Sequence, residues 1–278
     1  MKTICYENIV KTVAELTHAC SSVTPSCSAA MKAAAEKESN KNAKFALDTL
    51  IKNAQVAKER DLPVCQDTGM AVFFVKLGQD VHIDGGLLTD AINEGVRIGY
   101  KQYGYRASVL DPITRVNTKD NTPAVVHVEL VGGEGLEISF LPKGFGSENM
   151  SRLYMLTPSQ GLEGVKNCIV EAAKLAASNP CPPIVVGVGI GGTAEKAMEV
   201  AKYQLLREVD KPSDDETLAQ MEREVLGRIN ALRIGAQGFG GDTSALAVHI
   251  GKYPTHISAL PVAVNIQCNA VRVATAVL

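Results

Sequence analysis

The residues best suited to chemistry lie within residues 62–69, where a thiol (Cys65), an amide (Gln66), a carboxylate (Asp67) and a hydroxyl (Thr68) follow one another. Thiolates bind soft metals and iron–sulfur clusters, and a carboxylate beside such a centre can transfer protons. The alternative is an ordinary loop with a buried cysteine and a capping aspartate, since free cysteine is among the most buried residue types. These eight residues alone favour the ordinary loop, so the rest of the chain has to decide.

A predicted helix and a predicted strand flank this loop. The charged, helix-like residues 42–60 end shortly before Pro63, because a proline disfavours helical geometry in the residue before it. Residues 70–75, after the loop, are apolar throughout and predict a buried strand. We therefore expect the reactive side chains in a loop between these two elements.

Length and composition exclude several classes of protein. The 278 residues, 46% of them apolar, can bury a sizeable core, either in one large unit spanning 1–278 or in two lobes of it, 1–150 and 151–278. The 28 basic and 30 acidic residues are well mixed, so no nucleic-acid partner is expected. No run approaches the roughly 20 apolar residues of a membrane span, and the N-terminus lacks the apolar region of a signal peptide. We expect a cytoplasmic protein with no membrane partner.

The seven cysteines divide into two groups. An odd number in a cytoplasmic chain indicates reduced thiols or metal ligands more than disulfides. Cys65, Cys181 and Cys268 each lie in a predicted loop that borders a strand, but no local spacing rule links them and only the fold can bring them together. Prolines enclose Cys181, for which a ligand role and a structural role are equally open. A structural role is expected for the other four: Cys5, Cys20, Cys27 and Cys168.

The pattern along the chain predicts an α+β fold. A helix-rich N-terminal third comes first, because apolar residues recur three to four apart within residues 6–60, and a further helix is expected over 87–103. Residues 124–131 and 136–141 alternate apolar and polar around a glycine turn, which predicts an antiparallel hairpin in a mixed sheet. Strand–helix alternation follows after residue 150.

Two further loops contain many hydrogen-bonding groups. Residues 105–123 form a segment too long and too polar for a simple connector, which favours a functional loop. In residues 142–149, a lysine followed by glycines lets backbone N–H groups approach an anion, either a phosphate or a carboxylate. No phosphate-loop pattern closes this segment.

Gly187, Gly189 and Gly192 match the spacing of a dinucleotide-binding fingerprint. That fingerprint also needs a second strand with an acidic residue about 20 positions later, whereas residues 194–207 and 213–234 predict two successive helices. We expect no βαβ unit here and no nicotinamide cofactor. The helix N-terminus still offers a site for an anionic group.

Taken in order, these motifs resemble the α subunit of class I (iron–sulfur) fumarate hydratase, and the related L-tartrate dehydratase α subunit is similar. The resemblance covers nearly the whole chain. Two departures stand out: Phe145 occupies a position where a third glycine is expected, and the C-terminal domain of single-chain members is missing. The segments that carry the resemblance are residues 63–69, 106–123, 143–149, 181–183, 187–192 and 256–268.

The resemblance implies a [4Fe–4S] cluster in which Cys65, Cys181 and Cys268 hold three irons. The fourth iron is left open to substrate and acts as a Lewis acid. Asp67 would protonate the hydroxyl that leaves the substrate.

The resemblance also implies the substrate contacts and the partners. Gln66 and Arg106 would orient the carboxylates of a small dicarboxylate, since a guanidinium binds a carboxylate through two parallel hydrogen bonds. Gly144 would offer a backbone N–H, and His256 a hydrogen bond to the substrate or to Asp67. The base would come from a separate β subunit, in a hetero-oligomer that contains an α homodimer.

The expected reaction is the reversible hydration of fumarate to L-malate. One alternative is dehydration of L-tartrate, whose substrate differs by one hydroxyl. Another is a non-catalytic scaffold with a structural metal such as zinc, although zinc modules usually use paired, closely spaced ligands.

Overall fold

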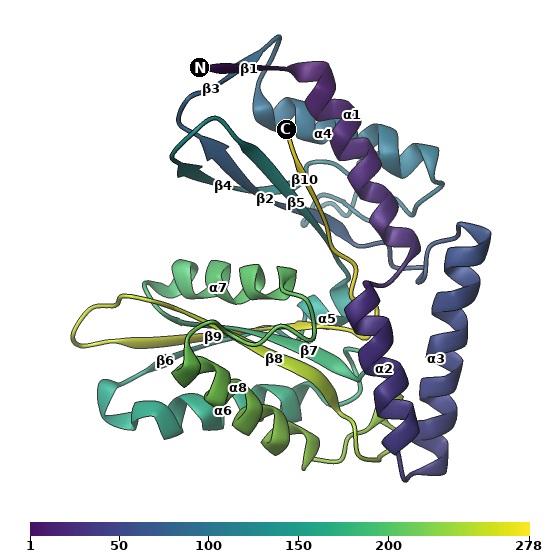
Figure 1. Ribbon diagram of the computed structural model, residues 1–278, viewed down its shortest axis with the longest axis vertical. Coiled ribbons are helices and arrows are strands. Elements are labelled where there is room, and N and C mark those ends of the chain that lie inside the picture. Colours follow the sequence, from purple (N-terminus) through teal and green to yellow (C-terminus); the bar gives the residue numbers. More distant parts are fainter. The chain divides into compact units, whose positions relative to one another are not determined.

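The computed structural model describes residues 1–278 and confirms the α+β fold (Figure 1). The chain divides into two compact units, each built from separated segments. Unit 1 comprises Met1–Val23, Ala57–Phe145 and Arg272–Leu278, and unit 2 comprises Thr24–Val56 and Gly146–Val271. No helix combines the length and the apolar composition that a membrane span requires.

Unit 1 is built on a four-stranded sheet in the order β10-β5-β2-β4. Two helices, α1 and α4, pack against each other and cover one face of this sheet (Figure 1). Their apolar stripes and the inward side chains of β2 and β5 form the core, which contains Phe73 and Phe140. The bounds are α1 (Tyr6–Leu16), η1 (Thr17–Ser21), β2 (Met70–Gly78), α4 (Leu88–Gln102), β4 (Val125–Val131), β5 (Leu136–Lys143) and β10 (Ala274–Val277), with a separate parallel pair, β1 (Lys2–Cys5) and β3 (Val81–Asp84).

Residues 124–131 and 136–141 form strands β4 and β5 nearly as expected, but the predicted antiparallel hairpin is wrong. Strand β2 lies between them, parallel to β4 and antiparallel to β5. Residues 71–75 of β2 are all buried, whereas β4 is more exposed, so β2 takes the central position and β4 the edge. The glycine turn crosses the end of β2, where Gly78 N donates to Gly135 O at 2.8 Å.

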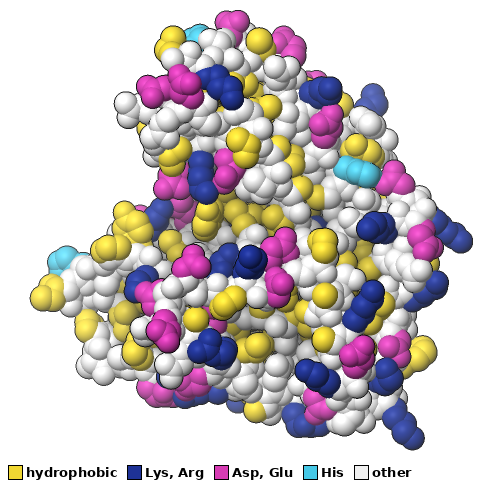
Figure 2. Space-filling view, in the orientation of Figure 1, with side chains coloured by type: hydrophobic (Ala, Val, Ile, Leu, Met, Phe, Trp, Pro, Cys, Tyr) yellow, Lys and Arg dark blue, Asp and Glu magenta, His cyan; other side chains and the backbone are white.

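Unit 2 is built on a second four-stranded sheet in the order β6-β9-β7-β8. Helices α6 and α8 pack on one face, and α7 lies on the other (Figure 1). The bounds are α2 (Pro25–Lys37), α3 (Lys41–Arg60, which ends in unit 1), α5 (Phe145–Glu148), β6 (Arg152–Leu156), η2 (Pro158–Gln160), α6 (Gly161–Ala176), β7 (Ile184–Gly191), α7 (Ala194–Tyr203), η3 (Gln204–Leu206), α8 (Glu216–Asn230), η4 (Ala236–Gly238), β8 (Ala245–Tyr253) and β9 (Leu260–Gln267). On the face shown in Figure 2, basic and acidic side chains are interspersed.

The prediction that no βαβ unit forms after β7 is wrong. Strands β7 and β8 are parallel neighbours, and α7 and α8 together form the crossover between them. In the sequence, the two successive helices had indicated that no such crossover forms. The glycines of the apparent fingerprint instead allow close packing of α7. A Cβ on Gly187 would lie 2.2 Å from Ala201 O, and one on Gly189 would lie 2.1 Å from Ala197 O.

Replacing Gly187 with Ala is expected to lower the free energy of unfolding by about 1–3 kcal/mol, because overpacking forces β7 and α7 apart. The change is measured as a lower midpoint of urea unfolding. The matched control is Gly227→Ala in α8, where no atom lies within 4 Å of an added Cβ. Alanine there should stabilise the chain by about 0.5–1 kcal/mol. Equal midpoints for the two variants would contradict the packing role.

Candidate active site

The loop that carries Cys65 begins where α3 ends. Asp61 adopts a left-handed conformation with φ of 53°, which terminates the helix. The chain then runs through the half-buried Cys65, the exposed Gln66 and the half-buried Asp67 before it enters β2. Buried Thr68 anchors the loop, and its hydroxyl donates to the backbone carbonyl of Arg106, whose own side chain is exposed.

Two backbone N–H groups fix the Asp67 carboxylate. Gly69 N donates to Oδ1 at 3.0 Å, and Phe145 N donates to Oδ2 at 2.9 Å. Gly144 lies against this carboxylate, because a Cβ at that position would be 3.1 Å from Oδ2. Within unit 1 the structure therefore brings Asp67 and Gly144 together, with Cys65 two residues away in the same loop.

The loop also needs glycine at position 69. Gly69 has a φ of +80°, and a Cβ there would lie 2.7 Å from Lys143 N on the paired strand β5. Glycine alone avoids both the strained conformation and the clash. This close approach of β2 and β5 sets the loop beside residues 143–145.

Side chains of unit 1 hold the backbone carbonyls of the loop, and the sequence analysis assigned none of them to the site. Arg272, Tyr100 and Asn121 are all buried, and only Asn121 lies in a segment that the sequence singled out as functional, residues 105–123. The hydrogen bonds are Arg272 Nη1 to Asp67 O (3.0 Å), Tyr100 Oη to Thr68 O (3.2 Å) and Gly69 O (3.1 Å), and Asn121 Nδ2 to Gly69 O (3.3 Å).

The other two candidate thiols lie in adjoining loops of unit 2. The carbonyl of Cys181 accepts from Asn269 Nδ2 at 2.6 Å and from Asn269 N at 3.3 Å, so the loop after β9 is bonded to the loop before β7. Cys181 is exposed and has a φ of 54°, and Cys268 is half-buried. A left-handed non-glycine residue persists only where its surroundings hold it, and here Asn269 is one of those contacts.

The remaining cysteines differ in their environment. None of the seven forms a disulfide. Burial raises the pKa of Cys20 to about 11, that of Cys27 to about 12 and that of Cys168 to about 11. These three thiols stay protonated at neutral pH and are poor metal ligands, in agreement with the structural role predicted for them. Cys5 is exposed on β1.

The three candidate ligands divide between the units, with Cys65 in unit 1 and Cys181 and Cys268 in unit 2. No group of three or more His, Cys, Asp or Glu side chains is gathered closely enough to hold a metal ion. The donor type fits an iron–sulfur cluster, because three cysteines outside the packed cores supply the thiolates that such clusters use.

His256 lies apart from the Cys268 loop within unit 2. It is exposed in the connection between β8 and β9, and its Nδ1 is 2.8 Å from Ser258 Oγ. It precedes β9, whereas Cys268 follows it, and a strand of eight residues spans about 26 Å at ~3.3 Å per residue. The structure does not bring these two residues together.

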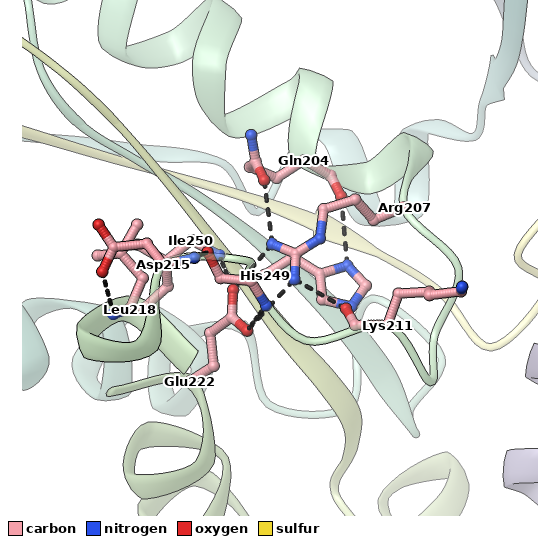
Figure 3. Close-up of polar contacts among 9 residues, drawn as sticks. Gln204, Arg207, Lys211, Asp215, Leu218, Glu222, His249 and Ile250 are labelled. Atoms are coloured by element: carbon pink, nitrogen blue, oxygen red, sulfur yellow. Dashed lines mark hydrogen bonds and ion pairs between the residues drawn. The ribbon is translucent and has the colours of Figure 1, made fainter. Parts of the chain in front are cut away.

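A second polar cluster lies in unit 2, where β8 and α8 meet the connection between α7 and α8 (Figure 3). Glu222 is 5% exposed and accepts from Arg207 Nη1 at 2.8 Å, Ser213 N at 2.9 Å and Ile250 N at 2.7 Å. Its carboxylate is satisfied by donors from the α7–α8 connection and from β8. We interpret the cluster as structural, since Glu222 joins these two segments to α8.

His249 in this cluster gives the stability a predictable pH dependence. Burial, and then the charge of Arg207, lower its pKa from 6.5 to about 4. Between these values the unfolded chain binds a proton that the folded chain does not. The free energy of unfolding should therefore fall by about 3 kcal/mol as the pH falls through this window.

Urea unfolding at pH 7.5 and pH 4.5 measures this effect. His249→Gln should reduce the difference between the two midpoints. The control His82→Gln, at an exposed position on β3, should leave it unchanged. The assignment is wrong if both variants keep the full difference of the unsubstituted chain.

Comparison with known proteins identifies the family. A family model described as fumarate hydratase (fumerase) matches residues 10–277. A putative L(+)-tartrate dehydratase subunit alpha of Methanocaldococcus jannaschii is 42% identical over 249 residues, covering 87% of each chain. The L(+)-tartrate dehydratase subunit alpha of Escherichia coli (strain UTI89) is 32% identical, over 87% of this chain and 81% of that one.

A putative class I fumarate hydratase of Geobacillus stearothermophilus is 31% identical over 88% of this chain, and the match covers 49% of that protein. The chain thus spans about half the length of that relative. Together these matches support a subunit of a hydro-lyase, an enzyme that adds or removes water. The chain belongs to the fumarate hydratase family, among the class I fumarate hydratases and the L-tartrate dehydratase α subunits. The family indicated by the sequence motifs is confirmed.

Proposed function

We propose that this chain is the cluster-binding α subunit of a hydro-lyase that interconverts fumarate and L-malate. The observation that carries the proposal is the Asp67 carboxylate, fixed by the Gly69 and Phe145 amides two residues from the Cys65 thiol. A fixed carboxylate next to a candidate cluster ligand suits a general acid that acts on a metal-activated hydroxyl.

Cys65, Cys181 and Cys268 are the proposed ligands of a [4Fe–4S] cluster. Their position outside the packed cores supports this role, because Cys20, Cys27 and Cys168 are buried. When bound, the cluster supplies a Lewis acid with one iron open to the substrate.

Dehydration of L-malate breaks one C–O bond and one C–H bond. Asp67 gives a proton to the departing oxygen, which leaves as water, and the Gly144 position leaves room beside its carboxylate. Gln66 and Arg106, both exposed on unit 1, bind the substrate carboxylates. The resemblance also assigns His256 a hydrogen bond to the substrate or to Asp67, and its place in the connection between β8 and β9 adds no support for that role within unit 2.

The base that removes the carbon-bound proton comes from a partner in this proposal. Relatives are named as alpha subunits, a name that implies a further subunit. A separate β subunit would then complete the enzyme, in a hetero-oligomer that contains two α chains.

Dehydration of L-tartrate is the second candidate. It is favoured by the 42% identity to a protein named as a putative tartrate dehydratase α subunit. The two substrates differ by one hydroxyl, and a site built to pair that hydroxyl discriminates by about 10⁴-fold or more against the analogue that lacks it.

The test is anaerobic co-expression of the chain with its β subunit, followed by iron quantitation and assays with malate, fumarate and tartrate. A brown, air-sensitive complex that turns over malate and fumarate supports the first candidate. Turnover of tartrate alone supports the second. A colourless, zinc-containing and oxygen-indifferent protein without turnover would overturn both and indicate a scaffold.

A further inference from the structure

Arg272 is a buried cation at the loop that carries Asp67. Its side chain is 1% exposed, and it lies in unit 1 immediately before β10. Arginine is almost never fully buried unless its charge is paired or hydrogen-bonded. One of its contacts is the hydrogen bond from Nη1 to the backbone carbonyl of Asp67 at 3.0 Å.

Asp67 is thereby held at both its main chain and its side chain. Arg272 fixes the carbonyl, while the amides of Gly69 and Phe145 fix the two carboxylate oxygens. Gly69 and Phe145 lie at opposite ends of one segment of unit 1, and Arg272 comes from its C-terminal segment. Losing the guanidinium leaves the Asp67 carbonyl without this donor, so the peptide is free to rotate and to turn the carboxylate away from its amides.

The guanidinium is also close to the space around the carboxylate. A Cβ on Gly144 would lie 3.9 Å from Arg272 Nη2 and 3.1 Å from Asp67 Oδ2. The positive charge of Arg272 affects neighbouring buried groups. It lowers the pKa of Cys20, although burial raises that pKa by more. Arg272 therefore lies close to both the main chain and the carboxylate of Asp67.

We propose that Arg272 is a positioning residue for the reaction, which holds the Asp67 main chain so that the carboxylate keeps its orientation without itself touching the substrate. The proposal rests on the proposed role of Asp67 as the acid. Small errors in the placement of a reacting group are costly, since a displacement of 1 Å can lower a rate by about 100-fold.

The test uses the complete α chain, alone and in complex with its β subunit. Arg272→Met removes the donor but keeps much of the apolar stem. Arg272→Lys keeps the charge and one donor but loses the planar fork. The control is Arg207→Met, which removes a largely buried arginine from the Glu222 ion pair within unit 2.

The first readout is hydrogen exchange of the Gly69 and Phe145 amides in the α chain alone. Arg272→Met should speed exchange at both amides by about tenfold or more, since local opening frees the Asp67 carboxylate, while exchange in the centre of β2 stays slow. Arg272→Lys should give an intermediate rate. Arg207→Met should leave both amides unchanged.

The second readout is steady-state kinetics of the iron-loaded complex, normalised to iron content. Arg272→Met should lower kcat by about 10–100-fold and change KM by less than about threefold, with partial recovery in Arg272→Lys. A rise in KM alone, or unchanged kcat together with unchanged exchange, would overturn the proposal. If Arg272→Met does not fold, Arg272→Lys decides: wild-type values of both kcat and exchange overturn it.

The two readouts separate this proposal from the proposed function. A wild-type complex that turns over neither malate nor tartrate refutes the proposed function. Exchange at the Gly69 and Phe145 amides would still show whether Arg272 holds Asp67.

Discussion

Replacing Asp67 with Asn is expected to lower kcat for malate dehydration by about 10²–10⁴-fold, the usual contribution of a positioned acid or base. The amide has nearly the same shape but cannot give up a proton as a carboxylic acid does. It also replaces one of the two oxygens that accept from Gly69 N and Phe145 N. KM should change much less, because the lost interaction is made in the transition state.

The matched control is Asp61→Asn, six residues earlier in the same connection. Asp61 is exposed and contacts His18 through Nε2 at 2.5 Å. Its substitution should leave kcat within about twofold, since surface ion pairs contribute little. Iron content is measured for both variants. The role of Asp67 as acid is wrong if Asp67→Asn retains wild-type kcat at full iron occupancy.

Replacing any one of Cys65, Cys181 and Cys268 with Ser should produce a large loss of both bound iron and activity. Each thiolate is a proposed iron ligand, and even groups that only support a metal ligand are worth about 10–100-fold in metal affinity or activity. We expect iron content to fall and activity to drop by more than about 100-fold for each variant. Visible absorbance and iron quantitation after anaerobic reconstitution measure the loss.

Cys5→Ser provides the control, because Cys5 is an exposed thiol on β1. It should keep wild-type absorbance and activity. A variant of Cys65, Cys181 or Cys268 with full iron content and full activity removes that residue from the ligand set. If all three behave in this way, the cluster assignment fails, although the membership of the family stands.

The sequence predicted the local features that depend on neighbouring residues. The apolar run of β2 and the proline that follows α3 determine the structure of residues only a few positions away. The helix, the loop and the strand around Cys65 could therefore be placed from the sequence. The structural role expected for Cys168 agrees with its place among the buried residues of α6, where it is 8% exposed. The α+β class followed from the same periodicities.

Features that depend on distant partners could not be predicted in this way. Strand β2 lies between β4 and β5. Which strands pair with the two edges of β2 depends on all the strands of the sheet, and the glycine turn between β4 and β5 does not show it. Gly187 and Gly189 have the spacing of a dinucleotide-binding fingerprint, and only the position of α7 shows that they serve packing. The role of Arg272 depends on a single contact with a residue 205 positions away in sequence.

The interleaved segments of the two units have a consequence for biosynthesis. Unit 1 takes its edge strand β10 and Arg272 from the C-terminal segment, and unit 2 takes α2 from residues before the middle of unit 1. Domains usually fold one after another as the ribosome extends the chain. Here unit 1 is the first unit to begin and the last to be completed. One edge of β5 must therefore stay unpaired in the nascent chain until residues 274–277 have been translated.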